Sequence, residues 1–356
     1  MNICIIGDNL TSLSLAKNLI NKKINVHIYK ENKINNLIKN RTIGISKKNF
    51  EFFNKQIEKI SKKNIWKIEK IEIYSEKNKN NKILNFEEEK NNLFYMLKND
   101  QLYKSLNNKL IKNKFFKRKI IKNDNLYKNL IKNKKYDLII NCDPLNFFGK
   151  KYFFRKMNKN YYNLAYTTIL DHEKLDNHTA IQIFTKLGPL AFLPISNSQT
   201  SVVYSIDINK HQYKEEEILV LINKHNPKFK IKKILKPQKF KLESSTLRNY
   251  YYKNILAFGD SLHKVHPLAG QGFNMTIRDI EVFSKIIKNR IDLGLQLDEL
   301  TFYEFERKTK HFNFIFSNGI DFIYEFFHFD KKIKNKRLNN LKKYIEENKK
   351  LNNILI

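Results

Sequence analysis

One segment of the sequence, residues 259–274, concentrates small, rigid and polar side chains. It consists of GDSLHKVHPLAGQGFN, in a chain with only nine Gly and six Pro. An apolar run at 255–258 precedes it, which predicts that Asp260 projects at the carboxyl edge of a sheet, where ligands bind. Gly270 and Gly272 would let the backbone approach a ligand at the start of a helix. The dipole of that helix favours an anionic or electron-rich group, so the segment predicts a ligand site.

Two histidines in this segment, His263 and His266, could be a pair of metal ligands. No third or fourth ligand follows at a suitable spacing, and Cys4 and Cys142 are the only cysteines. We therefore predict no metal site, and we interpret the two histidines as residues that order the loop.

The turn after the N-terminal apolar run is a second, weaker candidate site. A G-x-G-x-x-G turn brings backbone amides to a dinucleotide pyrophosphate, and here the three positions hold Gly7, Asn9 and Ser12. Asn tolerates a left-handed backbone better than most residues, and Ser is small. Lys30 stands where an acid would bind a ribose, and Glu31 follows it. On this turn alone, an ordinary strand–helix connection and a dinucleotide site explain the residues equally well.

Hydrophobic periodicity predicts the elements that must hold these turns. Residues 2–29 have a strand–helix–strand pattern, which predicts a parallel sheet with a right-handed crossover. Alternating stretches between 163 and 207 predict an antiparallel sheet inserted into the first domain. The stretch 104–135 carries twelve basic residues and one acid, and we interpret it as a solvated basic face. The fold class is therefore α/β.

The charge of the chain suggests a nucleic-acid binder, but its composition argues otherwise. The net charge is +33, yet only eight of the 68 basic residues are Arg, the residue that contacts bases and phosphates in a bidentate way. Lys is spread along the chain among Asn and Ile while Ala is scarce, which is typical of an AT-rich genome. We predict no nucleic-acid partner. The positive field would still favour anionic membrane surfaces and anionic cofactors.

Targeting signals and membrane spans are not visible in the sequence. No apolar run approaches the roughly 18–20 residues of a membrane span, and no basic segment precedes an apolar one at the N-terminus. Two cysteines suit a reducing compartment. We therefore expect a cytoplasmic protein.

The segment at 259–274 resembles the second flavin motif of the class A flavoprotein monooxygenases, and most of all that of the ubiquinone-biosynthesis hydroxylases. Supporting segments follow in the order of that family, over roughly residues 1–330: RTIGIS at 41–46, a helix start at 99–106, GPLAFLP at 188–194 and a helix at 302–307. The resemblance implies a Rossmann-like FAD-binding domain with an inserted antiparallel-sheet substrate domain and C-terminal helices. The domains expected are FAD-binding at 1–75, 95–160 and 245–300, substrate at 76–94 and 161–244, and helical at 301–356.

The resemblance also implies roles for single residues. Asp260 would hydrogen-bond the ribityl chain of FAD, Pro267 would pack beside the isoalloxazine, and the backbone at 270–272 would face its pyrimidine edge. Gly7 would approach the pyrophosphate, and Arg41 would lie near it. The cofactor-binding residues implied are Gly7, Asn9, Ser12, Glu31, Arg41, Asn99, Asp260, Pro267, Gly270, Gln271, Gly272 and Asn274.

The activity that the resemblance implies is an oxidoreductase, an FAD-dependent monooxygenase that hydroxylates a polyprenylated phenol in ubiquinone biosynthesis through a flavin C4a-hydroperoxide. It would use molecular oxygen and NAD(P)H or another electron donor. Because the flavin carries the chemistry, no catalytic side chain is named. Two alternatives stay open: a hydroxylase of a soluble aromatic, and a degenerate member that serves as a scaffold in a biosynthetic complex.

A phenylalanine-rich stretch at 312–329 is followed by a basic cluster at 331–337. Aromatic residues beside basic ones are typical of helices that lie on anionic lipid, and a prenylated substrate would lie in the bilayer. We therefore also expect peripheral association with the inner face of the membrane. Packing on the FAD-binding domain would explain the same phenylalanines.

Overall fold

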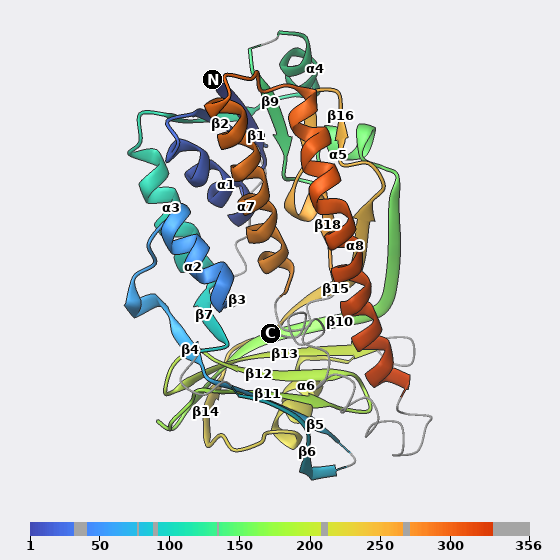
Figure 1. The fold of residues 1–356 in the computed structure, drawn as a ribbon. Helices are drawn as coiled ribbons and strands as arrows, with labels where there is room; N and C mark the ends of the chain where they lie inside the picture. The colour runs from blue at the N-terminus through green and yellow to red at the C-terminus, as the bar shows by residue number, and fades with distance from the viewer. Residues whose placement is uncertain are drawn as a thin grey trace.

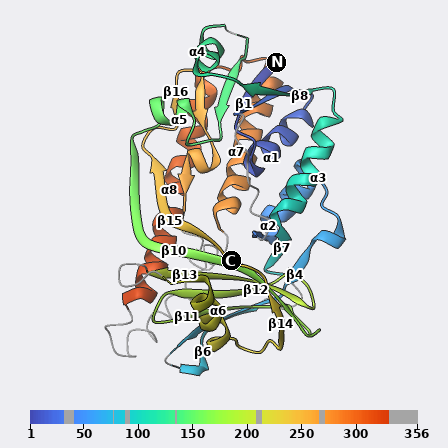
Figure 2. The ribbon, with the colours of Figure 1, turned by 180° about the vertical axis from the view of Figure 1, so that it is seen from behind.

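The computed structural model describes residues 1–31, 41–76, 78–87, 92–133, 135–207, 213–265 and 271–329. A parallel sheet with its helices forms the upper half of Figure 1, and a broad, mainly antiparallel sheet forms the lower half. Two long helices, α7 (Gln271–Asp292) and α8 (Glu299–Phe329), run from the upper half toward the lower one, as Figure 2 shows from behind.

The upper sheet has the strand order β16-β17-β9-β1-β2-β8, and all neighbouring pairs except β16–β17 are parallel. Ile3, Ile5 and Ile140 are fully buried in its centre, as expected of strands covered on both faces. The predicted parallel sheet is thus confirmed. Its strands are β1 (Asn2–Ile6), β2 (Asn25–Glu31), β8 (Phe116–Ile121), β9 (Leu138–Asn141), β16 (Tyr251–Tyr252) and β17 (Ile255–Ala257).

Three helices cover one face of the upper sheet. They are α1 (Leu10–Ile20), α3 (Asn99–Ile111) and α7, and α1 packs against both others. The apolar stripe of α7 is fully buried, as its helical spacing predicts: Ile277, Ile280, Phe283 and Ile287. Two shorter helices, α4 (Asp124–Lys132) and α5 (Phe147–Tyr152), lie at the upper end of the molecule in Figure 1.

The lower sheet has the order β18-β15-β10-β13-β12-β11-β5-β6, with β14 paired to β10. One face is covered by α6 (Glu215–Lys224), whose Ile218 and Ile222 join the core beneath the sheet. The other face is turned toward the upper half. Its strands are β5 (Lys70–Ser75), β6 (Asn78–Glu87), β10 (Lys156–His172), β11 (Thr179–Phe184), β12 (Pro189–Pro194), β13 (Gln199–Asp207), β14 (Ile231–Ile234), β15 (Gln238–Leu247) and β18 (His263–Lys264).

A small third sheet connects the halves, in the order β3-β7-β4. It consists of β3 (Thr42–Ser46), β4 (Trp66–Ile68) and β7 (Phe94–Lys98), and α2 (Lys47–Gln56) follows β3. The next strand, β5, already pairs with β11 of the lower sheet. The lower sheet therefore begins at Lys70, earlier than the boundary expected between residues 75 and 76.

The interpretation of residues 104–135 as a solvated face is wrong for part of this stretch. β8 is the edge strand of the upper sheet, and α4 packs against it. Phe116, Ile121, Tyr127 and Leu130 are buried there. Lys114, Lys117, Lys122 and Lys128 are exposed around them, and a count of charges therefore hides the buried positions.

Among the helices of the described residues, none combines the length and hydropathy that a membrane span requires.

Candidate active site

The first candidate turn joins β1 to α1. Gly7 has φ +113°, and a Cβ added there would lie 3.3 Å from Ser12 Oγ and 3.4 Å from Asp143 Cβ. Asn9 has φ −113° and is the N-cap of α1: its Oδ1 accepts from Ser12 N at 2.9 Å, and its Nδ2 donates to Cys142 O at 3.0 Å. The explanation of Asn9 by left-handed tolerance is therefore wrong, because its backbone is extended and its side chain caps the helix.

The N-terminus of α1 faces the cavity between the upper half and the lower sheet (the main cavity). The first helical bond of α1 runs from Leu13 N to Asn9 O, so the amides of Leu10 and Thr11 precede the helical ladder. Both residues line the cavity. Two amides together with the helix dipole make this end of α1 suitable for an anionic group such as a pyrophosphate.

An acid in the first turn is neutralised from a neighbouring strand. Asp8 has a side chain only 5% exposed, and Arg118 Nη2 on β8 donates to its Oδ1 at 3.0 Å. Lys30 Nζ lies 4.0 Å from Asp8 Oδ2. Burial and the Asp8 carboxylate raise the pKa of Tyr103 to about 12. The sequence analysis missed Arg118. Its charge neutralises the Asp8 carboxylate, which therefore does not repel an anion bound at this turn.

Glu31 ends β2 and lies in a second, open pocket of about 590 Å³. Its Oε1 accepts from Tyr127 OH at 2.8 Å, and burial together with this carboxylate raises the Tyr127 pKa. Ile121 and Leu145 also line the pocket. A carboxylate at the end of the second strand, beside apolar side chains, suits a ribose and a planar base.

The second candidate turn follows β17 and touches the first. Gly259 has φ +59°, and a Cβ there would lie 2.5 Å from Thr11 Cγ2. Asp260 is exposed and lines the main cavity together with Asn9 and Thr11. Cys142, at the end of β9, has a pKa raised to about 12 by burial, so its thiol is not a nucleophile at neutral pH.

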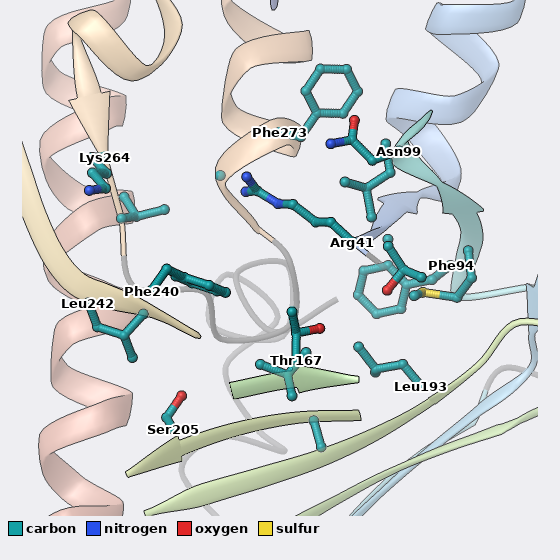
Figure 3. A pocket seen from close by; sticks show the side chains of 18 of the residues that line it. Arg41, Phe94, Asn99, Thr167, Leu193, Ser205, Phe240, Leu242, Lys264 and Phe273 are labelled. Atoms are coloured by element: carbon teal, nitrogen blue, oxygen red, sulfur yellow. The ribbon is translucent and has the colours of Figure 1, made fainter. Parts of the chain in front are cut away.

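The main cavity has a volume of about 440 Å³ and lies between the upper half and the lower sheet. Its upper wall is polar, with Arg41, Asn99, Asp260 and the backbone of Gly272. In Figure 3 the Arg41 side chain extends beneath Phe273, toward the start of α7. The peptide of Arg41 is held by Asn99, whose amide donates to its carbonyl at 3.0 Å.

The predicted residues of the 259–274 segment divide into three groups. Gly272 lines the cavity, whereas Pro267 and Gly270 lie outside the described residues. Gln271 is buried, and its Nε2 has no partner within the described part of the chain.

Asn274 holds α7 to the small sheet instead of facing the cavity. Its Nδ2 donates to Gly44 O at 2.9 Å, and its Oδ1 accepts from Ser46 N at 3.0 Å and from Asn49 Nδ2 at 2.9 Å. Its side chain is 4% exposed. The amide is therefore committed to bonds within the protein.

The histidine in this segment that the structure describes has a structural partner. His263 Nε2 and Asp279 Oδ2 lie 2.6 Å apart, and both side chains are almost fully buried. Asn313 Nδ2 on α8 donates to the same carboxylate at 3.3 Å. The pair thus ties β18 to α7 and α8. His266 lies outside the described residues, within which no group of three or more possible metal ligands occurs.

These features fit an FAD molecule. The pocket at Glu31, the free amides of α1, the exposed carboxylate of Asp260 and the polar upper wall follow one edge of the parallel sheet. An adenosine, a pyrophosphate, a polyol and a planar ring have complementary chemistry in the same order. The main cavity brings together four of the predicted residues from separate segments, Asn9, Arg41, Asn99 and Asp260, and Glu31 lines the second pocket at the end of β2.

Comparison with known proteins supports this assignment. The FAD binding domain family matches residues 151–295. The chain is 30% identical over 151 residues to "3-demethoxyubiquinol 3-hydroxylase" of Escherichia coli, which covers 40% of this chain and 38% of that protein. It is 25% identical over 186 residues to "Ubiquinone biosynthesis monooxygenase COQ6, mitochondrial" of Dictyostelium discoideum, which covers 42% and 38%. The family match covers less than half of the chain. The matches span less than half the length of each of these relatives.

Solved structures of other proteins share the fold of this chain. PqsL of P. aeruginosa in complex with 2-aminobenzoylacetate superposes with a TM-score of 0.71 at 12% identity, over 92% of this chain and 96% of that one. A single-residue variant of HpxO from Klebsiella pneumoniae, complexed with FAD, gives 0.66 at 10% identity, over 99% and 96%. The Rossmann-like fold with an inserted antiparallel sheet is thus confirmed.

Proposed function

We propose that this chain binds FAD and hydroxylates the ring of a polyprenylated phenol in ubiquinone biosynthesis. The observation that carries the proposal is the main cavity, whose polar upper wall suits a flavin and whose lower wall is lined mostly by apolar residues of β11 and β12. The names of the relatives, ubiquinone hydroxylases and monooxygenases, support this substrate class. NAD(P)H or another donor would serve as reductant, and molecular oxygen would be the co-substrate.

The residues of the chain would divide the work between holding the cofactor and enclosing the substrate. Glu31, the α1 amides and Asp260 would bind the adenosine, pyrophosphate and ribityl parts of FAD. When bound, FAD supplies the redox chemistry that activates oxygen. Phe94, Phe240 and other apolar side chains would exclude water from the reacting ring. The chain then needs to orient the ring, and no ionised base is assigned.

Association with a membrane is part of the proposal, because a polyprenyl chain partitions into lipid. On α8, Phe312, Phe314 and Ile315 are 63%, 51% and 47% exposed, whereas Phe316 and Ile320 are buried. Exposed apolar side chains on a surface helix suit contact with a bilayer. The rest of the predicted stretch, including the basic cluster at 331–337, lies outside the residues whose side chains are described. The proposed location is cytoplasmic, at the inner face of the membrane.

The test is incorporation of isotopically labelled O₂ into 2-geranylphenol by the purified, FAD-loaded protein with NAD(P)H or dithionite. We expect one labelled oxygen atom in the product, bonded to a carbon of the ring. Equal turnover of phenol without the prenyl chain would favour a soluble aromatic substrate. The proposed activity would be contradicted if the protein takes up FAD but only reduces oxygen to hydrogen peroxide, so that no labelled product forms. A protein that binds no FAD would favour the scaffold in a biosynthetic complex.

A further inference from the structure

Two hydroxyls stand out on the floor of the main cavity. Thr167 of β10 and Ser205 of β13 both line the cavity, and each residue is 3% exposed. Thr167 lies opposite Val203, and Ala165 lies opposite Ser205, so the two hydroxyl residues are diagonal neighbours on one face of the sheet. Figure 3 shows both side chains directed into the cavity.

Neither hydroxyl has a hydrogen-bond partner among the residues that the structure describes, which distinguishes them from their neighbours. Thr168 Oγ1, on the opposite face, donates to Leu235 O at 2.5 Å. Ser201 Oγ accepts from Thr42 Oγ1 at 2.9 Å. Both hydroxyls face the cavity, so their partner is a molecule inside the cavity. Two such groups directed into one cavity therefore point to a ligand that carries oxygen.

The surroundings of the two hydroxyls restrict the chemistry of that ligand. The lining residues that β10, β11, β12 and β13 contribute are all uncharged. The charged lining residues lie elsewhere. Arg41 and Asp260 belong to the upper wall, and Lys241, Glu243 and Lys264 come from β15 and β18, where Lys264 and Glu243 lie 3.9 Å apart as an ion pair. A carboxylate bound at the two hydroxyls would find no cation on the strands that carry them, whereas a neutral hydroxyl, ether or carbonyl oxygen would match a donor–acceptor side chain.

One arm of the cavity is apolar and suits a hydrocarbon chain. Ile68, Phe94 and Met96 line it, and Trp66, the single Trp of the chain, packs against the same cluster. Trp66 therefore lies close behind the wall of this arm, and its fluorescence can report on binding without any reaction.

We propose that Thr167 and Ser205 form an oxygen-binding subsite that orients a neutral, oxygen-substituted ring, with the attached chain in the Ile68–Met96 arm. This subsite rests on the proposed function, since the ring would lie between the floor and the flavin. It defines the substrate class as a phenol or phenol ether without a ring carboxylate. Thr167 and Ser205 are positioning residues that select the ring by its oxygens.

The test measures binding of 2-geranylphenol and of geranylbenzene, which lacks the oxygen, through Trp66 fluorescence of the FAD-loaded protein. In Thr167→Val and in Ser205→Ala, we expect the Kd for 2-geranylphenol to rise roughly 3- to 10-fold, the effect of one neutral hydrogen bond. The Kd for geranylbenzene should not change. Thr167→Ser should restore binding, and Thr179→Val, on β11 outside the cavity lining, is the matched control.

The outcomes separate the subsite from the proposed function. Binding that discriminates the two probes through Thr167 and Ser205 supports the subsite even where no hydroxylated product forms. Wild-type protein that binds both probes equally, or variants that bind 2-geranylphenol as tightly as wild type, would overturn it. Tighter binding of the para-carboxylate of 2-geranylphenol would overturn the assignment of a neutral ring. Urea unfolding of each variant shows whether its fold is retained.

Discussion

The turn after β1 and the turn after β17 meet at the proposed cofactor site, but they match the expected motifs in different ways. The first turn has a glycine, Gly7, at only one of the three fingerprint positions. At the second position, the side chain of Asn9 caps α1. The second turn retains Gly259, whose φ of +59° and contact with Thr11 leave no room for a Cβ. A side chain such as that of Asn9 can pair with the amides of a helix, but no side chain fits at Gly259, where there is no space for a Cβ. We therefore expect substitution to be tolerated better at Asn9 than at Gly259.

The largest expected effect comes from filling the space between the turns. Gly259→Ala adds a left-handed non-glycine residue and a clash with Thr11, and should lower the free energy of unfolding by about 2–5 kcal/mol. Gly294→Ala is the matched control, because its φ is +68° with nothing within 4 Å. It should lose only the backbone part, about 1–2 kcal/mol.

The double variant Gly259→Ala/Thr11→Ser sharpens this result by removing the clashing methyl. Urea unfolding should show it to be more stable than Gly259→Ala alone. If Gly259→Ala and Gly294→Ala lose equal free energy of unfolding, the contact with Thr11 does not exclude a Cβ at position 259. The contrast between the two turns would then be wrong.

The second prediction concerns the ligand rather than the fold. Asp260 is exposed, so Asp260→Ala should leave unfolding of the FAD-free protein unchanged. A lost hydrogen bond to a carboxylate should weaken FAD binding roughly 10- to 100-fold, measured by flavin fluorescence quenching. Asp292→Ala, near the far end of α7 with a side chain 61% exposed, is the control. An unchanged affinity for FAD would remove Asp260 from the site.

The smallest effect is expected at the first turn. Asn9→Ala removes an N-cap and should lower the free energy of unfolding by about 1 kcal/mol. Asn9→Asp keeps a capping oxygen but places a carboxylate at the proposed pyrophosphate position, so it should bind FAD more weakly than Asn9→Ala does. If Asn9→Asp binds FAD as tightly as wild type, the pyrophosphate does not lie at this turn.

Sequence patterns predicted those parts of the fold whose signal is local. The run at 255–258 and the buried face of α7 were predictable because apolar residues recur at the period of their element. β8 was not, because an edge strand with lysines on its outer face resembles a charged loop.

The candidate site was predictable to a smaller extent, for a related physical reason. Asp260 and Arg41 follow from motifs, but the pairing of Asp8 with Arg118 joins residues far apart in sequence. The positions of Thr167 and Ser205 depend on strand register, which decides which face of the sheet each hydroxyl occupies. Hydrophobic periodicity predicts that side chains alternate between the two faces of a strand, but it does not predict which face borders a cavity.

The most direct test of this account is the stoichiometry of FAD in the purified protein. The chain is loaded with FAD, passed through a desalting column and unfolded, and the released flavin is measured by its absorbance and fluorescence. The account predicts one FAD for each chain in wild type and a much smaller fraction in Asp260→Ala. A folded wild-type protein that retains no FAD under these conditions would contradict the cofactor site described at the two turns.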